Sequence, residues 1–447
     1  MNRNLFCVAA AGVLAVSLLA PSEASATDAL RSYVEAPDDS FSFERKKTLP
    51  LPGSQAHVLE LVSQTWQGKP WVHKLVVVVP DKIRVSGVCL LLITGGSNRK
   101  IDFETLPGEA HLVAIAAGAA GTPVAVLQQV PNQPLFGDLY EDDAIAYTFQ
   151  KFMENEDPTW PLLLPMTKSA VRAMDAVQAF LEAERKRKIE RFVVTGGSKR
   201  GWTTWLTGAV DGRVQAIAPM VIDVLNIPRQ MKHQLDAWGA YSPSISEYTK
   251  LGLQEKLAGP EARSLLEAVD PYAHRERLTM PKLVILGTND DYWPVDAARF
   301  YFFDLPGPKY LHYVPNVGHG LDLSVVNTLT GFYQDVIAGR TMPRLSWSFE
   351  TGEVEAVLTL KSYAPGASVE IFRAVSDDRD FRDETWTSQA SEMEEEGVWV
   401  HREPLPGQGY VAFYGALDHE SVGGKRYHLC THVGVFPALE DARDEGR

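Results

Sequence analysis

Ser198 is the residue whose surroundings in the sequence most directly predict chemistry. It follows a β-branched run, residues 191–195, and two glycines, Gly196 and Gly197, and it precedes a helical stretch that begins near Trp202. A serine on such a tight strand-to-helix turn projects its hydroxyl toward a substrate carbonyl, and glycines beside it remove side chains that would clash there. The amides of the following helix can stabilise the oxyanion that develops during acyl transfer. The segment therefore predicts a nucleophilic serine.

The spacing of the glycines departs from the common Gly-x-Ser-x-Gly form. Gly196 lies two residues before Ser198, whereas Gly201 lies three residues after it, with Lys199 and Arg200 between them. A serine that only caps a helix after a strand would fit the same letters. The motif therefore has to be judged together with a base and an acid elsewhere in the chain.

His319 and Asp290 follow two later apolar runs in the order that a Ser-Asp-His set requires. Asp290 comes soon after the run 283–287, and His319 lies between two glycines after the run 310–314. Hydrolases with a nucleophile on such a turn carry the acid and the histidine on loops in this chain order. We predict that His319 is the general base and that Asp290 fixes its tautomer and stabilises the imidazolium.

Two other carboxylates are alternative acids. Asp291 is the direct neighbour of Asp290 and could take its place, and Asp223 follows another predicted strand, residues 216–221. The order of the residues alone does not choose among the three.

A second donor for the oxyanion is predicted on the loop after residues 88–93. Gly95, Gly96 and Ser97 follow this apolar run, and two glycines allow backbone amides to approach a substrate closely. A plain Gly-Gly turn is the alternative interpretation. Lys199 could add positive charge beside the oxyanion, or its ammonium could simply be solvated.

The elements that must position these residues alternate between apolar runs and helical stretches, which predicts a sheet with helices on both faces. The predicted strands are 71–79, 88–93, 124–128, 191–195, 216–221, 283–287 and 310–314. The predicted helices include 142–153, 168–184, 202–210, 295–305 and 321–338. Most of the strands are continuous runs of Val, Ile and Leu, as in parallel strands that are buried on both faces. Residues 27–340 are therefore predicted to form an α/β-hydrolase domain with a doubly wound, mostly parallel sheet.

A second domain is predicted for residues 343–438. Beyond Pro343, helical periodicity gives way to short alternating runs separated by Gly, Pro, Asp and Ser. The predicted strands are 347–350, 354–360, 368–374, 397–401, 410–415 and 427–436. This pattern favours a small C-terminal β-sandwich-like domain.

The beginning of the chain predicts export. Residues 1–26 combine a basic start, an apolar run and the small residues Ala24, Ser25 and Ala26, which is typical of a cleaved signal peptide. The apolar run is short for a spanning helix, so we expect a periplasmic or secreted protein with no stable membrane anchor. Beyond this segment the only cysteines are Cys89 and Cys430, which are expected to be buried free thiols.

Charge and motifs exclude several kinds of partner. Asp and Glu total 57 against 43 Lys and Arg, a net charge of −14, which argues against binding to nucleic acid. The sequence contains no His-Glu-x-x-His, no paired Cys-x-x-Cys and no phosphate-binding Gly-x-x-x-x-Gly-Lys-Ser/Thr. No metal and no cofactor are therefore predicted, and composition says nothing about the oligomeric state.

Several longer motifs resemble the PhoPQ-activated pathogenicity-related family. They are Ser63-Gln-Thr-Trp, Val130-Pro-Asn-Gln-Pro, Asp157-Pro-Thr-Trp-Pro, Val171-Arg-Ala-Met-Asp-Ala, Gly197-Ser-Lys-Arg-Gly-Trp-Thr-Thr-Trp-Leu, Gly287-Thr-Asn-Asp, Asp380-Phe-Arg and Tyr410-Val-Ala-Phe. The resemblance implies an α/β-hydrolase-like enzyme, usually exported in bacteria, with a C-terminal β-domain. The turn around the serine is also similar to that of glucuronoyl esterases, in which a basic residue follows the nucleophile, as Lys199 does here.

Together these features predict an exported serine hydrolase that cleaves a small-molecule ester or a peptide through an acyl-enzyme. An esterase and a peptidase both fit, because an appended β-domain can control the access of peptides. The main alternative is a catalytically silent secreted binding protein on a hydrolase fold. A carbohydrate-binding module built on the β-domain is a third interpretation.

Overall fold

The computed structural model describes residues 28–439, so the predicted signal peptide lies outside the described part of the chain. The strands before residue 340 are β1 (Ser42–Leu51), β2 (Ser54–Trp66), β3 (Lys69–Pro80), β4 (Val88–Ile93), β5 (Val124–Leu127), β6 (Arg191–Gly197), β7 (Val214–Met220), β8 (Lys282–Gly287) and β9 (Lys309–Val314). Strands β5, β4, β6, β7, β8 and β9 are parallel neighbours in this order, and β1, β2 and β3 extend the sheet antiparallel beside β5. The predicted mostly parallel sheet is confirmed.

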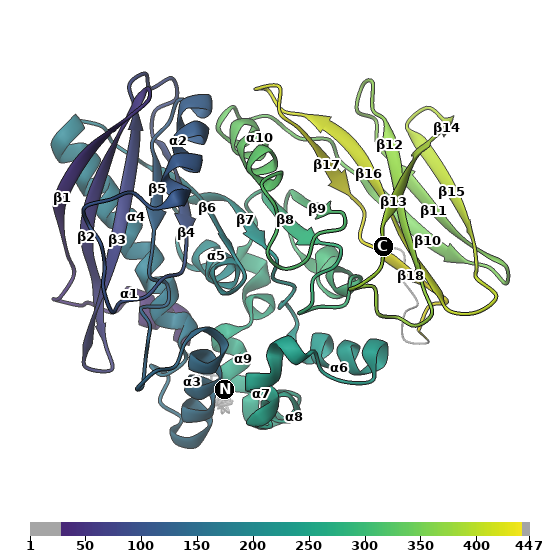
Figure 1. Ribbon diagram of the computed structural model, residues 1–447, viewed down its shortest axis with the longest axis horizontal. Coiled ribbons are helices and arrows are strands. Elements are labelled where there is room, and N and C mark those ends of the chain that lie inside the picture. Colours follow the sequence, from purple (N-terminus) through teal and green to yellow (C-terminus); the bar gives the residue numbers. More distant parts are fainter. Residues whose placement is uncertain (1–27, 440–447) are drawn as a thin grey trace, which may run out of the picture.

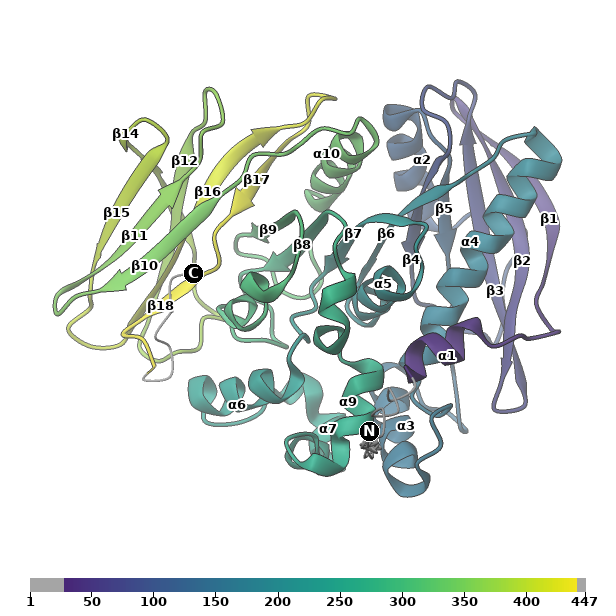
Figure 2. The same ribbon diagram turned by 180° about the vertical axis from the view of Figure 1, so that it is seen from behind.

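The main helices are α1 (Ala29–Glu35), α2 (Gly108–Ala120), α3 (Glu141–Asn155), α4 (Leu163–Arg185), α5 (Lys199–Val210), α6 (Ile227–Trp238), α7 (Ser246–Lys250), α8 (Leu253–Leu257), α9 (Arg263–Val269) and α10 (Val325–Ile337). Helices α2 and α10 lie on one face of the sheet and α4 and α5 on the other (Figures 1 and 2). None of the helices within residues 28–439 has both the length and the apolar character that crossing a bilayer requires.

Side chains of the central strands alternate between two hydrophobic cores. On β3, Leu75 and Val77 pack into the core under α4 and α5, whereas Val76 and Val78 pack into the core under α2 and α10. Successive residues of a strand point to opposite faces, so a run of consecutive valines fills both cores at once. This is the physical reason that the continuous apolar runs form covered strands.

The short helices α7 and α8, together with α3 and α6, gather beyond one end of the central strands (Figure 1). This is the end at which β6 passes into α5, so these helices stand over the turn that carries Ser198. They form a helical layer that encloses the space next to this turn.

One predicted helix, residues 295–305, is wrong. The structure has two short 3₁₀ turns there, Ala297–Phe300 and Phe302–Asp304. Tyr301 between them has φ −145°, and its buried hydroxyl donates a hydrogen bond to Asp223 at 2.5 Å. The buried hydroxyl thus finds an acceptor at the point where the helical path is interrupted.

The C-terminal part consists of β10 (Ser346–Thr351), β11 (Glu355–Lys361), β12 (Val369–Ser376), β13 (Thr387–Ser391), β14 (Met393–Glu395), β15 (Val398–Pro404), β16 (Tyr410–Glu420), β17 (Arg426–Cys430) and β18 (Gly434–Phe436). β17 continues the central sheet beyond β9 through a single residue pair, Cys430 opposite Leu311, and β16, β12, β13 and β18 follow. A separate sheet, β10-β11-β15-β14, packs against them. Cys89 and Cys430 are both buried and unbridged, as predicted.

Candidate active site

Ser198 occupies a strained turn between β6 and α5. Its backbone has φ +57° and ψ −126°, a conformation that residues with a side chain rarely adopt, and its amide donates to the Met220 carbonyl at 2.9 Å. A Cβ atom at Gly196 would lie 2.8 Å from the Arg200 backbone, and one at Gly201 would lie 2.8 Å from the Met220 carbonyl. The irregular glycine spacing therefore reflects where strand and helix approach each other most closely.

Three of the predicted residues form a continuous hydrogen-bonded chain. The Ser198 hydroxyl lies 2.8 Å from His319 Nε2, and His319 Nδ1 lies 3.0 and 2.9 Å from the two carboxylate oxygens of Asp290. Because a carboxylate only accepts, Nδ1 carries the hydrogen and Nε2 is left to accept from the serine. Asp290 is buried and also accepts from the Tyr292 amide at 2.9 Å, which fixes its orientation.

The alternative acids, Asp291 and Asp223, form hydrogen bonds with other partners. Asp291 is exposed, and its carboxylate accepts a hydrogen bond from Ser244 at 2.5 Å. Asp223 is buried and accepts from Tyr301 instead of His319. Burial raises the pKa of Asp223 to about 7, the Tyr301 hydrogen bond opposes that rise, and the charge of Asp290 adds to it. Among the three carboxylates it is Asp290 that contacts His319.

The loops that carry Asp290 and His319 are fastened to each other and to the C-terminal part of the chain. The Asn289 side chain donates to the carbonyls of Arg382 at 3.0 Å and Glu384 at 2.8 Å. Asn316 exchanges two hydrogen bonds with the backbone of Trp386, at 2.9 and 2.7 Å. We call residues 381–386 the clasp segment, since it holds both loops.

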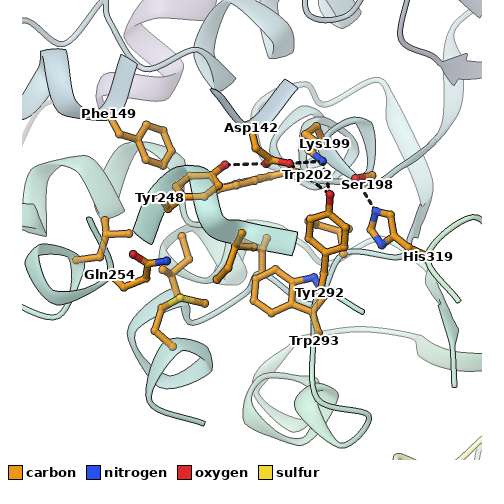
Figure 3. A pocket seen from close by; sticks show the side chains of 16 residues that line it. Asp142, Phe149, Ser198, Lys199, Trp202, Tyr248, Gln254, Tyr292, Trp293 and His319 are labelled. Atoms are coloured by element: carbon orange, nitrogen blue, oxygen red, sulfur yellow. Dashed lines mark hydrogen bonds and ion pairs between the residues drawn. The ribbon is translucent and has the colours of Figure 1, made fainter. Parts of the chain in front are cut away.

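An apolar pocket opens beside Ser198 and His319. Figure 3 shows these two residues at one end, with Trp202 and Tyr292 next to them and Gln254 farther in. The remaining lining residues are Asp142, Phe149, Lys199, Ile222, Val224, Ile227, Met231, Ile245, Tyr248, Leu257 and Trp293. They come mainly from α3, α5, α6, α7 and α8, so the helical layer builds the pocket.

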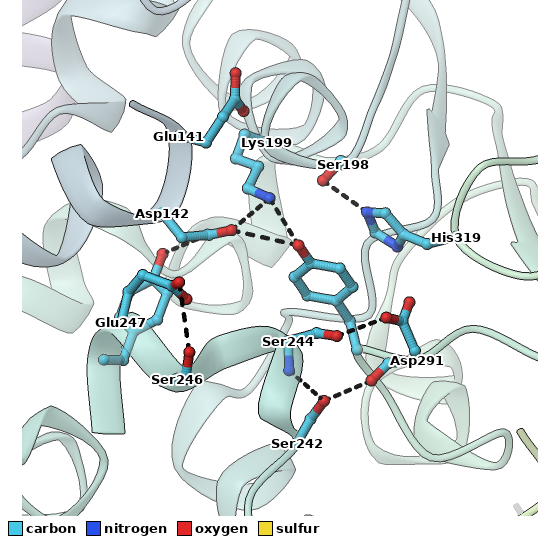
Figure 4. Close-up of polar contacts among 12 residues, drawn as sticks. Glu141, Asp142, Ser198, Lys199, Ser242, Ser244, Ser246, Glu247, Asp291 and His319 are labelled. Atoms are coloured by element: carbon cyan, nitrogen blue, oxygen red, sulfur yellow. Dashed lines mark hydrogen bonds and ion pairs between the residues drawn. The ribbon is translucent and has the colours of Figure 1, made fainter. Parts of the chain in front are cut away.

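Lys199 points away from the serine hydroxyl and into a polar cluster (Figure 4). Its ammonium lies 2.5 Å from the Asp142 carboxylate and 3.2 Å from the Tyr292 hydroxyl, and Asp142 also accepts from Tyr248 at 3.0 Å. Burial lowers the pKa of Lys199, but the charge and hydrogen bond of Asp142, together with those of Tyr292, outweigh burial and raise it. The Tyr292 ring in turn stacks on His319, with centroids 4.1 Å apart. The cluster thus braces the imidazole from one side.

The loop predicted to supply an oxyanion donor packs against residues that flank the pocket. A Cβ atom at Gly95 would collide with the Arg200 guanidinium, which is paired with Glu141. Gly96 has φ +132°. Gly95, Gly96 and Ser97 are not among the residues that line the pocket beside Ser198. The close approach of Arg200 is one reason for glycine at position 95.

Asp290, Asp291 and His319 are the one group of described residues whose ligand atoms are near enough to hold a metal, within 4.8 Å of one another. Both ring nitrogens of His319 are already hydrogen-bonded, to Ser198 and to Asp290. The arrangement therefore suits proton transfer better than metal binding.

No sequence motif assigns a role to Asp142, Tyr248 or the two asparagines, Asn289 and Asn316, that bind the clasp segment. Asp142 lies in a run of three acidic residues at the start of α3, which resembles an ordinary solvated helix end. Asn289 lies directly before Asp290, and this adjacency was the one available signal.

Comparisons with known proteins agree with this architecture. Among solved structures, an acetyl xylan esterase from Paenibacillus sp. R4 aligns with a TM-score of 0.50 at 14% identity, over 70% of this chain and 93% of the other. Acetyl xylan esterase 1 from Thermoanaerobacterium sp. JW/SL YS485 aligns with a TM-score of 0.48 at 13% identity, over 69% and 91%. At these identities the similarity concerns the fold, which is that of the α/β-hydrolases.

Similarity at the level of sequence identifies the family. The chain is 34% identical over 341 residues to the autocrine proliferation repressor protein A of Dictyostelium discoideum, an alignment that covers 72% of this chain and 68% of that protein. The family model for PhoPQ-activated pathogenicity-related proteins matches residues 30–382, which include Ser198, Asp290 and His319. The chain therefore belongs to the PhoPQ-activated pathogenicity-related protein family.

Proposed function

We propose that the protein is a serine hydrolase that cleaves an ester or amide bond through an acyl-enzyme. The observation that carries this proposal is the hydrogen-bonded chain from Ser198 through His319 to Asp290, on a strained turn beside an apolar pocket. A silent binding protein would have no need to keep the serine backbone at φ +57° with its hydroxyl 2.8 Å from an imidazole.

In the proposed reaction the Ser198 oxygen attacks the substrate carbonyl while His319 Nε2 takes the hydroxyl proton. The imidazolium, stabilised by Asp290, then gives this proton to the departing alcohol or amine, and an ester to Ser198 remains. Water attacks that ester, His319 accepts the water proton, and its return to Ser198 releases the acid.

The developing oxyanion needs backbone donors. The Lys199 amide stands at the first position of α5, where a helix leaves its N–H groups without intrahelical acceptors. We assign the first donor to this amide and the second to the loop Gly95, Gly96 and Ser97. The Lys199 side chain forms part of the pocket wall, and its ammonium is not assigned to the oxyanion because it is held by Asp142.

Covalent labelling tests this function. The folded wild-type protein should react with a fluorophosphonate probe at Ser198, and Ser198→Ala should not react, because these probes trap an activated serine hydroxyl. Ser244→Ala is the matched control, since Ser244 contacts Asp291 near the site but lies outside the hydrogen-bonded chain. No labelling of the wild type, or labelling that survives in Ser198→Ala, would overturn the proposal.

Export is part of the same proposal. If residues 1–26 are a signal peptide, the protein recovered from the periplasm or the medium should begin at Thr27. Determining the N-terminal sequence of the fractionated protein checks this, and an intact N-terminus in the cytoplasmic fraction would contradict it.

A further inference from the structure

The pocket beside Ser198 is small. Its cavity volume is about 60 Å³. A cavity of roughly 150 Å³ lined by Leu, Ile and Phe holds one benzene molecule, so on the same scale this pocket holds roughly two or three carbon atoms. The far wall is closed by buried side chains, among them Phe149, Met231 and Leu257.

The pocket wall is also electrically neutral. Five of its described lining residues are ionisable, Asp142, Lys199, Tyr248, Tyr292 and His319. Burial raises the pKa of the two tyrosines, so their hydroxyls are uncharged at neutral pH. Lys199 and Asp142 form an ion pair at 2.5 Å, and His319 is engaged by Asp290. A charged group entering the pocket would lose its hydration without gaining an unpaired counter-charge, which is costly.

These two observations constrain one side of the scissile bond. The carbonyl carbon must sit at the mouth of the pocket, within reach of the Ser198 oxygen, and whatever it carries inward must fit the space behind Trp202 and Tyr292. The leaving group must instead receive a proton from His319 and reach solvent, which the closed end does not allow.

We infer that the substrates are esters of short, uncharged acids with roughly two to four carbon atoms. The inference rests on the proposed function and specifies its acyl group. An acyl group that carries a carboxylate is not expected to bind here, because the charge of Lys199, next to the nucleophile, is already neutralised by Asp142.

A series of 4-nitrophenyl esters tests the length. kcat/KM should be highest among acetate, propionate and butyrate and should fall at least about 10-fold from butyrate to octanoate, since extra methylenes cannot enter a closed pocket. Leu257→Ala and Met231→Ala enlarge the far end and should move the optimum toward hexanoate. Leu235→Ala on the exposed side of α6 is the matched control and should leave the profile unchanged.

A monosuccinate ester tests the charge. It is as long as butyrate but ends in a carboxylate, and its kcat/KM should be at least about 10-fold lower than that of butyrate. Asp142→Asn leaves the Lys199 ammonium unpaired and should narrow this difference.

The possible failures are distinguishable. Rates that keep rising to octanoate, or equal rates for butyrate and monosuccinate, in a protein whose Ser198 is labelled would overturn the acyl assignment and leave the hydrolase intact. No hydrolysis of any ester together with no labelling of Ser198 would overturn the proposed function itself.

Discussion

His319 is held at both ring nitrogens and on one ring face by groups of different kinds. Ser198 and Asp290 bind its two nitrogens, and the Tyr292 ring stacks on its face at 4.1 Å. Tyr292 is itself held through its hydroxyl by Lys199. An imidazole fixed this way loses little freedom when the substrate arrives, which is the condition for efficient proton transfer.

Substitution of Asp290 and, separately, of Asp291 tests which of the two carboxylates assists His319. Asp290→Asn should lower kcat for the preferred ester on the order of 10³- to 10⁴-fold, because an amide does not enforce the tautomer that leaves Nε2 free to accept. Asp291→Asn, an equally conservative change on an exposed carboxylate, should lower kcat less than about 3-fold. Steady-state kinetics of the two variants decide the question, and comparable losses in both would contradict the assignment.

At the scale of single residues, the sequence was informative for side chains that follow the end of a strand. Ser198, Asp290 and His319 each follow an apolar run, and parallel strands bring their ends to one edge. The pairing of Lys199 with Asp142 could not be predicted, because it joins helices whose relative placement depends on the packing of the whole helical layer.

At the scale of elements, the clasp segment links the C-terminal part to the two loops of the site. The side chains of Asn289 and Asn316 each donate a hydrogen bond to backbone carbonyls of this segment. The two loops also bond to each other, because the backbone N–H of Asn289 donates to the Val317 carbonyl at 3.0 Å. A Cβ atom at Gly287 would lie 2.3 Å from the Val317 carbonyl, which shows how closely the loops pack.

Removing one of these contacts should loosen the catalytic geometry without affecting the pocket. Asn289→Ala and Asn316→Ala should each lower kcat about 10-fold with little change in KM, because a misplaced imidazole slows chemistry more than binding. Their rate of labelling by a fluorophosphonate should fall in parallel. Asn327→Ala, on the exposed side of α10, is the matched control and should behave as the wild type. Unchanged kcat in both variants would mean that the loops are held without the clasp segment.

The predicted elements match the structure best for the central parallel strands. They match worst at the antiparallel edge of the sheet, β1 and β2, and at the two 3₁₀ turns within residues 295–305. β4 was predicted at its observed bounds because its run of apolar residues is bounded clearly on both sides. β1 and β2 were both missed. β1 is an outer strand whose side chains are largely exposed, so alternation is weak, and in β2 polar residues interrupt the apolar run. The segment 295–305 has helical composition but forms two short 3₁₀ turns, and the bond from Tyr301 to Asp223 is a tertiary contact that local sequence does not reveal.

At the scale of the whole molecule, the buried Asp296 joins three parts of the chain. It lies 2.6 Å from His233 of α6, 3.4 Å from Arg299 and 3.5 Å from Arg379 of the C-terminal part. Burial raises the pKa of Asp296, but the cationic neighbours, His233 first and then the two arginines, outweigh burial and hold it well below its usual range. The carboxylate therefore stabilises the assembly only while it is ionised.

Asp296→Asn should lower the free energy of unfolding at neutral pH by about 3 kcal/mol, because it leaves buried guanidinium groups without their counter-charge. An acid whose pKa is depressed on folding stabilises above its unfolded pKa, and that stabilisation is lost as pH falls toward the folded value. The difference between wild type and variant should thus be full at neutral pH and shrink below about pH 4. Urea denaturation across this range measures it.

Asp236→Asn is the control for this experiment, because Asp236 forms an exposed ion pair with Lys232, and both residues lie on α6. It should cost less than about 1 kcal/mol at every pH. A difference for Asp296→Asn that is equally small, or that grows in acid, would contradict the stabilising role.

The position of the clasp segment in the sequence has a consequence for when the proposed activity can appear. A ribosome completes Ser198, Asp290 and His319 before it reaches residues 381–386, so a growing chain has its reactive groups before it has the segment that aligns them. We expect esterase activity to appear only once the C-terminal strands have been made and folded. The geometry of two asparagine side chains would in this way delay the proposed activity until the C-terminal strands have formed.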